Sequence, residues 1–191
     1  MNKKCRPITQ DEYEKIINIL RSGFYYYNQK VSSKERIADA LVLEANLGMR
    51  IEDILVLRLS NFIKSGNKYR IEIVEQKTGK KRDLNIPLEI INFIQDYAIK
   101  WGIGKEQKLF PFGERNVQKY LQMVCEILGY DDVGTHSFRK MFAQSIYKEN
   151  GNDPVLVQKL LLHSSLSVTQ CYLGIDAEQM EKALQKNVNL I

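Results

Sequence analysis

Residues 136–172 read HSFRKMFAQSIYKENGNDPVLVQKLLLHSSLSVTQCY, and this stretch decides the class of fold. It predicts three helices, over residues 136–149, 154–161 and 165–173. Gly151-Asn152-Asp153 separates the first pair of helices and His163-Ser164-Ser165 the second pair, because such residues favour turns. The C-terminal part of the chain is therefore expected to be almost entirely helical.

Helices are also expected in the N-terminal half. Thr9-Gln10-Asp11-Glu12 is a capping box, in which the Thr and Glu side chains bind free backbone N–H groups of a first turn. Ser32-Ser33-Lys34-Glu35 begins a second helix, and Gly48 is placed to end it. Between them, the aromatic residues 24–27 are expected to form a linker that packs on the domain. Further helices are predicted from Pro87 to about Gly102 and over residues 114–128.

A small sheet interrupts the helices. Residues 69–74 alternate between apolar and polar side chains as a half-buried strand does, and residues 83–86 suit a returning strand. Residues 77–80 form the turn between them, and residues 61–64 are expected to add a first strand. The predicted fold class is α+β, mainly α-helical, with a three-stranded antiparallel sheet near residues 61–86.

The composition fits one soluble domain. The chain has 191 residues, of which 44% are hydrophobic and 27% charged, so it can bury a core. No apolar stretch reaches the length of a membrane span and no signal segment follows Met1, so we expect a cytoplasmic protein without membrane contact. The three cysteines lack metal-binding spacing, which predicts free thiols and no metal site: Cys5, Cys125 and Cys171.

The positive charge is confined to one segment. Residues 64–82 hold seven Lys or Arg against two Glu, which accounts for the whole net charge of +5. Such a surplus is typical of an edge that contacts nucleic-acid phosphates, although a solvated hairpin would show the same composition. We expect Lys80, Lys81 and Arg82 to contact DNA.

The residues suited to chemistry lie in five short segments. The signatures of nucleotide-binding loops, zinc proteases and serine hydrolases do not occur, so the polar residues need another interpretation. Taken singly, each segment has an ordinary explanation, such as a surface salt bridge for an arginine or a packing role for a tyrosine. The segments are Leu47-Gly48-Met49-Arg50-Ile51-Glu52-Asp53, Lys77-Thr78-Gly79, His136-Ser137-Phe138-Arg139, Leu162-His163-Ser164-Ser165 and Tyr172.

In this order and spacing, the segments resemble the catalytic domain of the tyrosine recombinases, which include phage integrases and fimbrial-switch invertases. The resemblance runs from about residue 6 to residue 185. It implies a site-specific recombinase that cleaves and rejoins DNA through a 3′-phosphotyrosine. Because the covalent intermediate stores the bond energy, such an enzyme needs neither ATP nor a cofactor.

The resemblance assigns a role to each matched residue. Arg50 and Arg139 would hold the non-bridging phosphate oxygens, because a planar guanidinium group can donate hydrogen bonds to two such oxygens at once. Tyr172 would be the nucleophile and His136 the general base that takes its proton.

The remaining roles are assigned in the same way. Lys77 would protonate the departing 5′ oxygen, with Lys80 and Lys81 as rivals for that role. His163 would donate a hydrogen bond to the phosphate, and Asp53 would orient the hydrogen bonds of the site.

The sequence departs from the family pattern at two residues and in its expected domain content. Leu162 stands where relatives usually have Gly, and Lys140 stands where a second histidine often follows the arginine. We also expect a single catalytic domain over residues 1–191, without the N-terminal helical domain that clamps DNA in most integrases. The chain would then be either an excised fragment or a short recombinase.

Other functions remain open at this point. One is an inactive DNA-binding regulator on the same scaffold, and another is a topoisomerase or resolvase with the same chemistry. The resemblance implies double-stranded DNA as partner, a monomer in free solution and a homotetramer on paired sites. A helix over residues 176–187 would dock on a neighbouring protomer or fold back on its own domain.

Overall fold

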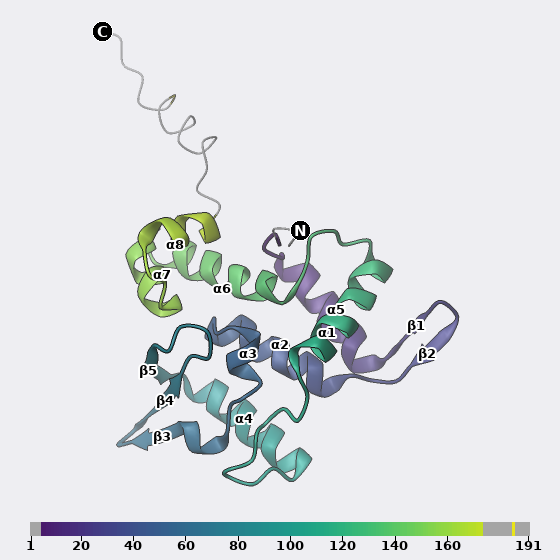
Figure 1. The fold of residues 1–191 in the computed structure, drawn as a ribbon, viewed down its shortest axis with the longest axis horizontal. Coiled ribbons are helices and arrows are strands. Elements are labelled where there is room, and N and C mark those ends of the chain that lie inside the picture. The colour runs from purple at the N-terminus through teal and green to yellow at the C-terminus, as the bar shows by residue number, and fades with distance from the viewer. Residues whose placement is uncertain (1–4, 174–184, 186–191) are drawn as a thin grey trace.

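The computed structural model, which describes residues 5–173 and residue 185, is mainly helical, with a small sheet at one side (Figure 1). Apart from the strands β1 and β2, the main elements follow the order that the sequence predicts. Their bounds are α1 (Gln10–Ser22), β1 (Phe24–Tyr26), β2 (Gln29–Val31), α2 (Glu35–Leu47), α3 (Ile51–Ile54), the 3₁₀ helix η1 (Leu59–Asn61), β3 (Phe62–Ser65), β4 (Lys68–Val74), β5 (Lys81–Ile86), α4 (Leu88–Trp101), α5 (Glu114–Leu128), α6 (Thr135–Glu149), α7 (Pro154–Leu161) and α8 (Leu166–Leu173).

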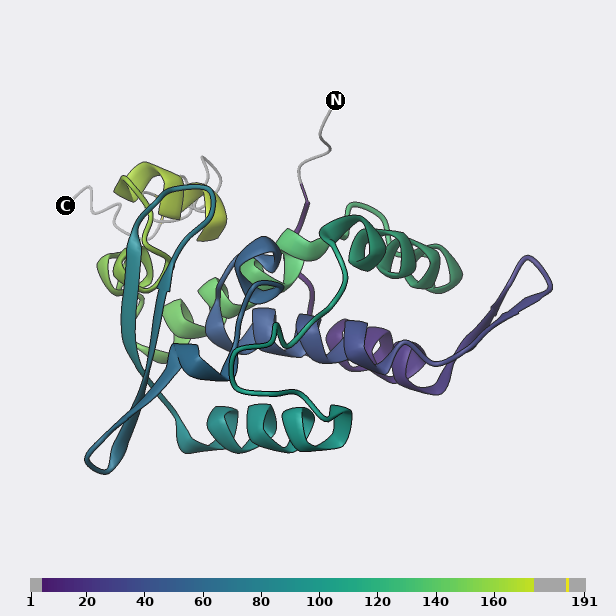
Figure 2. The same cartoon turned by 60° about the horizontal axis from the view of Figure 1, so that its bottom comes forward.

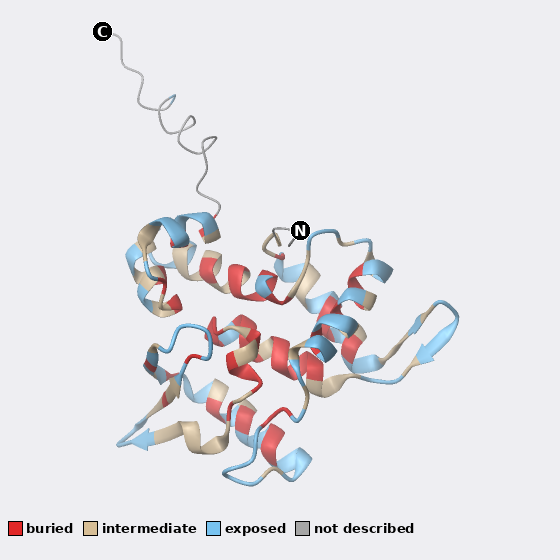
Figure 3. Ribbon diagram, in the orientation of Figure 1, coloured by how far each residue is buried: buried red, intermediate tan, exposed pale blue. Residues whose placement is uncertain are grey.

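Helix α2 forms the centre of the core. It packs against both α1 and α6, and its buried residues lie on all sides, as an enclosed helix requires (Figure 3). By contrast, α1 and α5 each bury one stripe and expose the other, so they form the outer layer. A smaller cluster around Val157, Leu161 and Leu173 joins α7 and α8 to α6.

The predicted ends of the first two helices are confirmed. The capping box is present at Thr9, whose hydroxyl accepts the N–H of Glu12. Gly48 ends α2 with a left-handed φ of 59°, and a Cβ there would lie 2.3 Å from the ring of Phe142. Only glycine fits this turn. Two residues later, Arg50 is the extended N-cap residue that precedes α3.

The three-stranded antiparallel sheet is also confirmed, with strand order β3-β4-β5. Ile71 in the central strand pairs with Phe62 on one side and Leu84 on the other, and it is fully buried. This apolar row fixes the register, because a shift of one residue would turn it towards solvent. The loop after β4, residues 75–80, reaches towards α7 and α8 (Figure 1).

The expected linker at residues 24–27 is instead the start of a β-hairpin, which projects from the body (Figure 2). Tyr27 and Asn28 adopt positive φ angles of 44° and 62°, which suit the two-residue turn of a twisted hairpin. Tyr27 is 83% exposed and Tyr25 is 68% exposed, so their predicted packing on the domain is wrong. Phe24 does pack against the core.

Some sequence predictions fall outside these observations. The helix expected over residues 176–187 lies outside the described residues, apart from Gln185. The assignment of one domain to residues 1–191 stays a prediction. None of the three cysteines forms a disulfide, and no helix within the described residues is long and apolar enough to cross a membrane.

Candidate active site

Arg139 lies at the centre of the candidate site, on the second turn of α6. Its side chain is fully buried, and it donates hydrogen bonds to the carbonyl oxygens of Gly48, at 2.7 Å, and Leu161, at 2.8 Å. Among the described residues it forms no ion pair. Burial and the nearby charge of Arg50 lower the pKa of Arg139 to about 10. Its charge is therefore poorly compensated and favours the approach of an anion.

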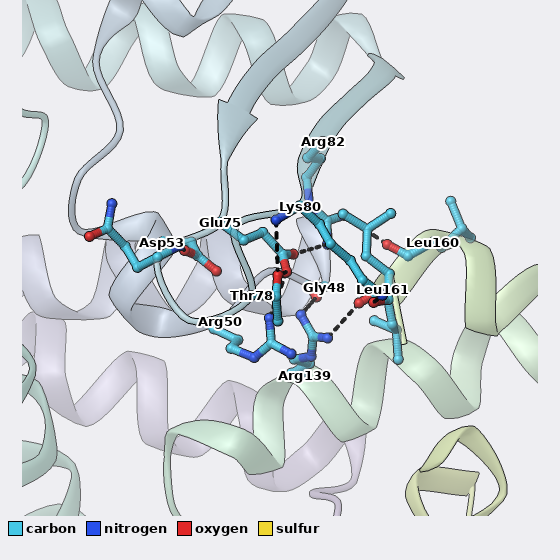
Figure 4. A network of polar contacts seen from close by, with 12 residues as sticks. Gly48, Arg50, Asp53, Glu75, Thr78, Lys80, Arg82, Arg139, Leu160 and Leu161 are labelled. Atoms are coloured by element: carbon cyan, nitrogen blue, oxygen red, sulfur yellow. Dashed lines mark hydrogen bonds and ion pairs between the residues drawn. The ribbon is translucent and has the colours of Figure 1, made fainter. Parts of the chain in front are cut away.

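Arg50 approaches the same place from the junction of α2 and α3 (Figure 4). It donates to Oε2 of Glu75 at 2.7 Å, and Thr78 donates to the same oxygen at 2.9 Å. Oε1 of Glu75 accepts from Arg82 at 2.8 Å. Burial alone would raise the pKa of Glu75, but the bonds from Arg82 and Thr78 keep it below its usual value. The ionised Glu75 thus holds Arg50 in place.

The sequence analysis assigned no role to Glu75. One signal was available, since Glu75 is one of only two acidic residues among the seven Lys and Arg of residues 64–82 and lies two positions before Lys77. A carboxylate in such a position is either exposed or paired with several cations at once. Only its zero exposure in the folded chain selects the second interpretation.

Arg82, which the sequence analysis expected to contact DNA, is instead buried in this structure. Its side chain is 1% exposed, bonded to Glu75 and, at 2.7 Å, to the carbonyl oxygen of Leu160. Strand alternation explains the difference, because Arg82 shares the inward face of β5 with Leu84 and Ile86.

The other two predicted DNA contacts stay more accessible than Arg82. Lys81 is exposed on the outward face of β5, 3.8 Å from Glu72 and 3.9 Å from Asp83. Lys80 is half-buried and donates to the carbonyl oxygen of Leu162 at 2.8 Å. Lys81 is therefore the best placed of the three for a phosphate contact.

The loop that carries Lys77 is held by Asp53. Oδ1 of Asp53, on α3, accepts the N–H of Gln76 at 2.7 Å. The carboxyl is buried, which raises its pKa. Lys77 itself is exposed at the tip of the loop, so it is free to reach a bound ligand. The supporting role expected of Asp53 is thus directed at the backbone beside Lys77.

His136 lines an open cavity of about 700 Å³ together with Lys140 and Tyr172. The residue is exposed overall, yet the cavity wall reduces the hydration of its ring. This loss of hydration, followed by the charges of Arg139 and Arg50, lowers the pKa of His136. The imidazole is therefore neutral at neutral pH and can accept a proton.

His163 and Tyr172 lie edge to face, with ring centroids 4.7 Å apart. Nδ1 of His163 is 3.0 Å from the hydroxyl of Thr169, which fixes the ring. Burial, then the charges of Arg139 and Arg50, lowers the pKa of His163 to about 4. The ring is therefore neutral at neutral pH, so that one of its nitrogens can donate a hydrogen bond.

The departure at Leu162 has a structural consequence. Leu162 ends α7 in the left-handed conformation, with φ at 53°. This conformation costs a non-glycine residue about 1–2 kcal/mol. The turn directs His163 towards Tyr172, so the protein keeps the geometry that glycine would give at lower cost.

The structure thus brings most of the predicted site residues together. Cζ of Arg139 lies 5.9 Å from the ring centroid of Tyr172, beside His163, and His136 faces the same cavity. Lys77 is exposed on its loop, and its charge also contributes, after burial and the two arginines, to lowering the pKa of His136. Among the described residues, no group of three His, Cys, Asp or Glu side chains could hold a metal ion.

Comparison with known proteins identifies the family of the chain. The model of the phage integrase family matches residues 6–179. The probable integrase/recombinase YoeC of Bacillus subtilis is 29% identical over 143 residues, which cover 72% of this chain and 77% of YoeC. Tyrosine recombinase XerC of Bradyrhizobium diazoefficiens is 30% identical over 154 residues, which cover 76% of this chain and 47% of XerC.

The fold has solved counterparts as well. The crystal structure of the XerH site-specific recombinase bound to its difH substrate aligns with a TM-score of 0.67 and 22% identity, covering 96% of this chain and 55% of that one. The chain thus spans about half the length of XerC and XerH. Since the family model covers most of the sequence and the fold is that of a recombinase catalytic domain, the chain belongs to the phage integrase family.

Proposed function

We propose that this protein is a site-specific DNA recombinase that cleaves and rejoins strands through a 3′-phosphotyrosine at Tyr172. One observation carries the proposal. Tyr172 packs against His163 and Arg139 and shares a cavity with His136, so a nucleophile, a base and phosphate-binding groups converge. Regular packing of a lone tyrosine would not require this set of partners.

The chemistry follows from these positions. A phosphate of the DNA backbone would bind between Arg50 and Arg139, whose charges stabilise the extra negative charge of the transition state. His136 takes the phenolic proton as the oxygen of Tyr172 attacks phosphorus. The bond to the 5′ oxygen breaks, and Lys77 protonates this oxygen. The products are a 3′-phosphotyrosine and a free 5′-hydroxyl, and the reverse steps rejoin a strand.

The DNA would lie across the basic sheet and the open cavity. Lys64, Lys68, Lys77 and Lys81 are exposed on or beside the sheet, and all carry charge suited to backbone phosphates. Arg82 has no part in this surface. The enzyme would act in the cytoplasm at the DNA of its host.

We expect a monomer in free solution and a homotetramer on two paired sites. Complete exchange between two duplexes breaks four strands, and each chain supplies one nucleophile at Tyr172. Sedimentation of the free protein should therefore give the mass of a monomer. A stable tetramer without DNA would contradict this assembly.

The decisive experiment uses a nicked suicide substrate, selected from random DNA by binding to the protein. Cleavage of such a substrate releases a short fragment and leaves the protein covalently attached, visible on a denaturing gel. We expect the wild type to form the adduct and Tyr172→Phe to bind the same DNA without forming it. An adduct with Tyr172→Phe would move the nucleophile, and binding without any wild-type adduct would favour an inactive regulator.

The role of Lys77 has its own test. A 5′-bridging phosphorothiolate departs without needing a proton, so it should restore cleavage by Lys77→Ala. Rescue of Lys80→Ala or Lys81→Ala instead would move the general acid. Product topology on a supercoiled plasmid with two sites separates recombination from topoisomerase activity.

A further inference from the structure

Lys140 makes two contacts that the proposed mechanism does not use. Its ammonium nitrogen donates to the carbonyl oxygen of Cys5 at 2.5 Å, and it lies 5.5 Å from the ring centroid of Tyr172. The residue is 9% exposed, so these contacts form in a largely desolvated place. Lys140 is thus shared between the nucleophile and the N-terminal segment of the chain.

Hydrogen bonds and an ion pair hold the N-terminal segment, residues 5–6, against the domain. The backbone N–H of Arg6 bonds to the carbonyl oxygen of Asp132 at 2.8 Å, and the guanidinium of Arg6 pairs with Glu12 at 2.6 Å. A Cβ on Gly134 would lie 3.0 Å from Sγ of Cys5, so the two segments are closely packed. Residues 5–6 therefore lie across the loop that leads into α6.

These contacts converge on the cavity already described. Cys5, His136, Lys140 and Tyr172 all line it, although Cys5 and Tyr172 are distant in the sequence. The carbonyl of Cys5 helps to hold the ammonium of Lys140 at the place from which it faces Tyr172. A change in the position of residues 5–6 would thus affect Tyr172 through the side chain of Lys140.

We infer that Lys140 is a positioning residue for Tyr172. The position of the N-terminal segment, residues 5–6, would in turn determine where the Lys140 side chain lies. The inference rests on the proposed function, since it concerns cleavage by Tyr172. A cation near an aromatic ring orients that ring and favours the negative charge that develops on the phenolic oxygen. A shift of residues 5–6 would then change the rate of cleavage.

The first test compares single-turnover cleavage of the suicide substrate by Lys140→Met and Lys140→Arg. Methionine keeps an unbranched stem but removes the charge, and we expect about tenfold slower adduct formation with unchanged DNA affinity. Arginine should recover most of the rate. The defect of Lys140→Met should persist on the phosphorothiolate substrate, because Lys140 acts on the attacking group and not on the leaving group.

The second test measures coupling. Arg6→Ala loosens the segment and should slow cleavage about threefold in the wild type but not further in Lys140→Met, since both changes act on one contact. Arg21→Ala is the matched control: Arg21 pairs with Asp39 at 2.7 Å and its side chain is 41% exposed, against 39% for Arg6. Arg21→Ala should leave the rate unchanged in both backgrounds.

The outcomes separate the two proposals. Failure of the wild type to form an adduct would contradict the proposed function. A wild-type adduct together with a Lys140→Met rate within twofold of normal would overturn the inference alone. The inference would also be overturned if the rate reductions caused by Arg6→Ala and Lys140→Met multiplied in the double variant. A Lys140→Arg variant that fails to recover the rate would overturn it too, provided that thermal unfolding shows every variant to be folded.

Discussion

Arg82 on β5 and Arg139 on α6 are both buried, yet the protein uses their charges differently. Each donates to a carbonyl oxygen of α7, Arg82 to Leu160 and Arg139 to Leu161. Arg82 also pairs with the carboxylate of Glu75, whereas the second partner of Arg139 is the carbonyl oxygen of Gly48. Because a carbonyl carries only a partial charge, most of the positive charge of Arg139 remains for a ligand.

The charges of Arg82 and Arg139 therefore act on different parts of the protein. The pair of Arg82 and Glu75 joins the sheet to α7 and fixes Arg50, so its effect is on the fold and on the position of another residue. Arg139 lies beside Tyr172, and its charge adds to the effect of burial in lowering the pKa of both His136 and His163. Four measurements can break or sharpen the contrast.

The largest effect is expected from Arg139→Lys. Lysine keeps a charge but cannot contact two phosphate oxygens in one plane, so cleavage should slow by about 100- to 1000-fold. Single-turnover adduct formation measures this, with DNA affinity as the control. A loss below tenfold would mean that Arg139 serves the fold in the same way as Arg82.

Arg82→Met should instead reduce stability. It leaves Glu75 buried with one fewer cation, which costs about 3–5 kcal/mol. Urea unfolding should show a lower midpoint, and cleavage measured where the variant is still folded should fall much less than with Arg139→Lys. Lys81→Met, its exposed neighbour on β5, is the control and should change stability by less than about 0.5 kcal/mol.

Glu75→Gln tests the same contrast through pH. The pKa of Glu75 is lowered on folding, so its contribution to stability is complete above its unfolded value, about 4.5, and is lost as pH falls through the lower folded value. The wild type should therefore lose stability on acidification below about pH 4.5. Glu75→Gln should lose less over that range, and equal losses would show that Glu75 is not ionised.

The smallest effect concerns DNA binding. Lys81→Ala should reduce the slope of log affinity against log salt by about one unit, because one phosphate contact is lost. Arg82→Ala, measured under conditions where it is folded, should leave the slope unchanged, since its guanidinium is buried. An equal change in both slopes would mean that the inward face of β5 opens on DNA.

Local sequence signals predicted most of the helices and strands, whereas the resemblance to the recombinase family supplied the candidate site residues. The capping box at Thr9, the glycine turn at Gly48 and the alternation around Ile71 depend on residues only a few positions apart. The hairpin at residues 24–31 escaped because its turn has no glycine, and four aromatic residues in a row hide the alternation. Arg82 was misassigned because total charge was counted without the inward and outward faces of β5.

Apart from the hairpin at residues 24–31, the sequence by itself determined where the main helices and strands lie. It also identified Arg50, His136, Arg139, His163 and Tyr172 as candidates, because their types and order resemble those of the recombinase family. Tertiary structure alone decided what surrounds each charge. Arg139 bonds to Gly48 across 91 positions, Arg82 to Leu160 across 78, and Lys140 to Cys5 across 135. The reason is physical: the function of a cation depends on its burial and its partners, and these arise only when distant segments pack together.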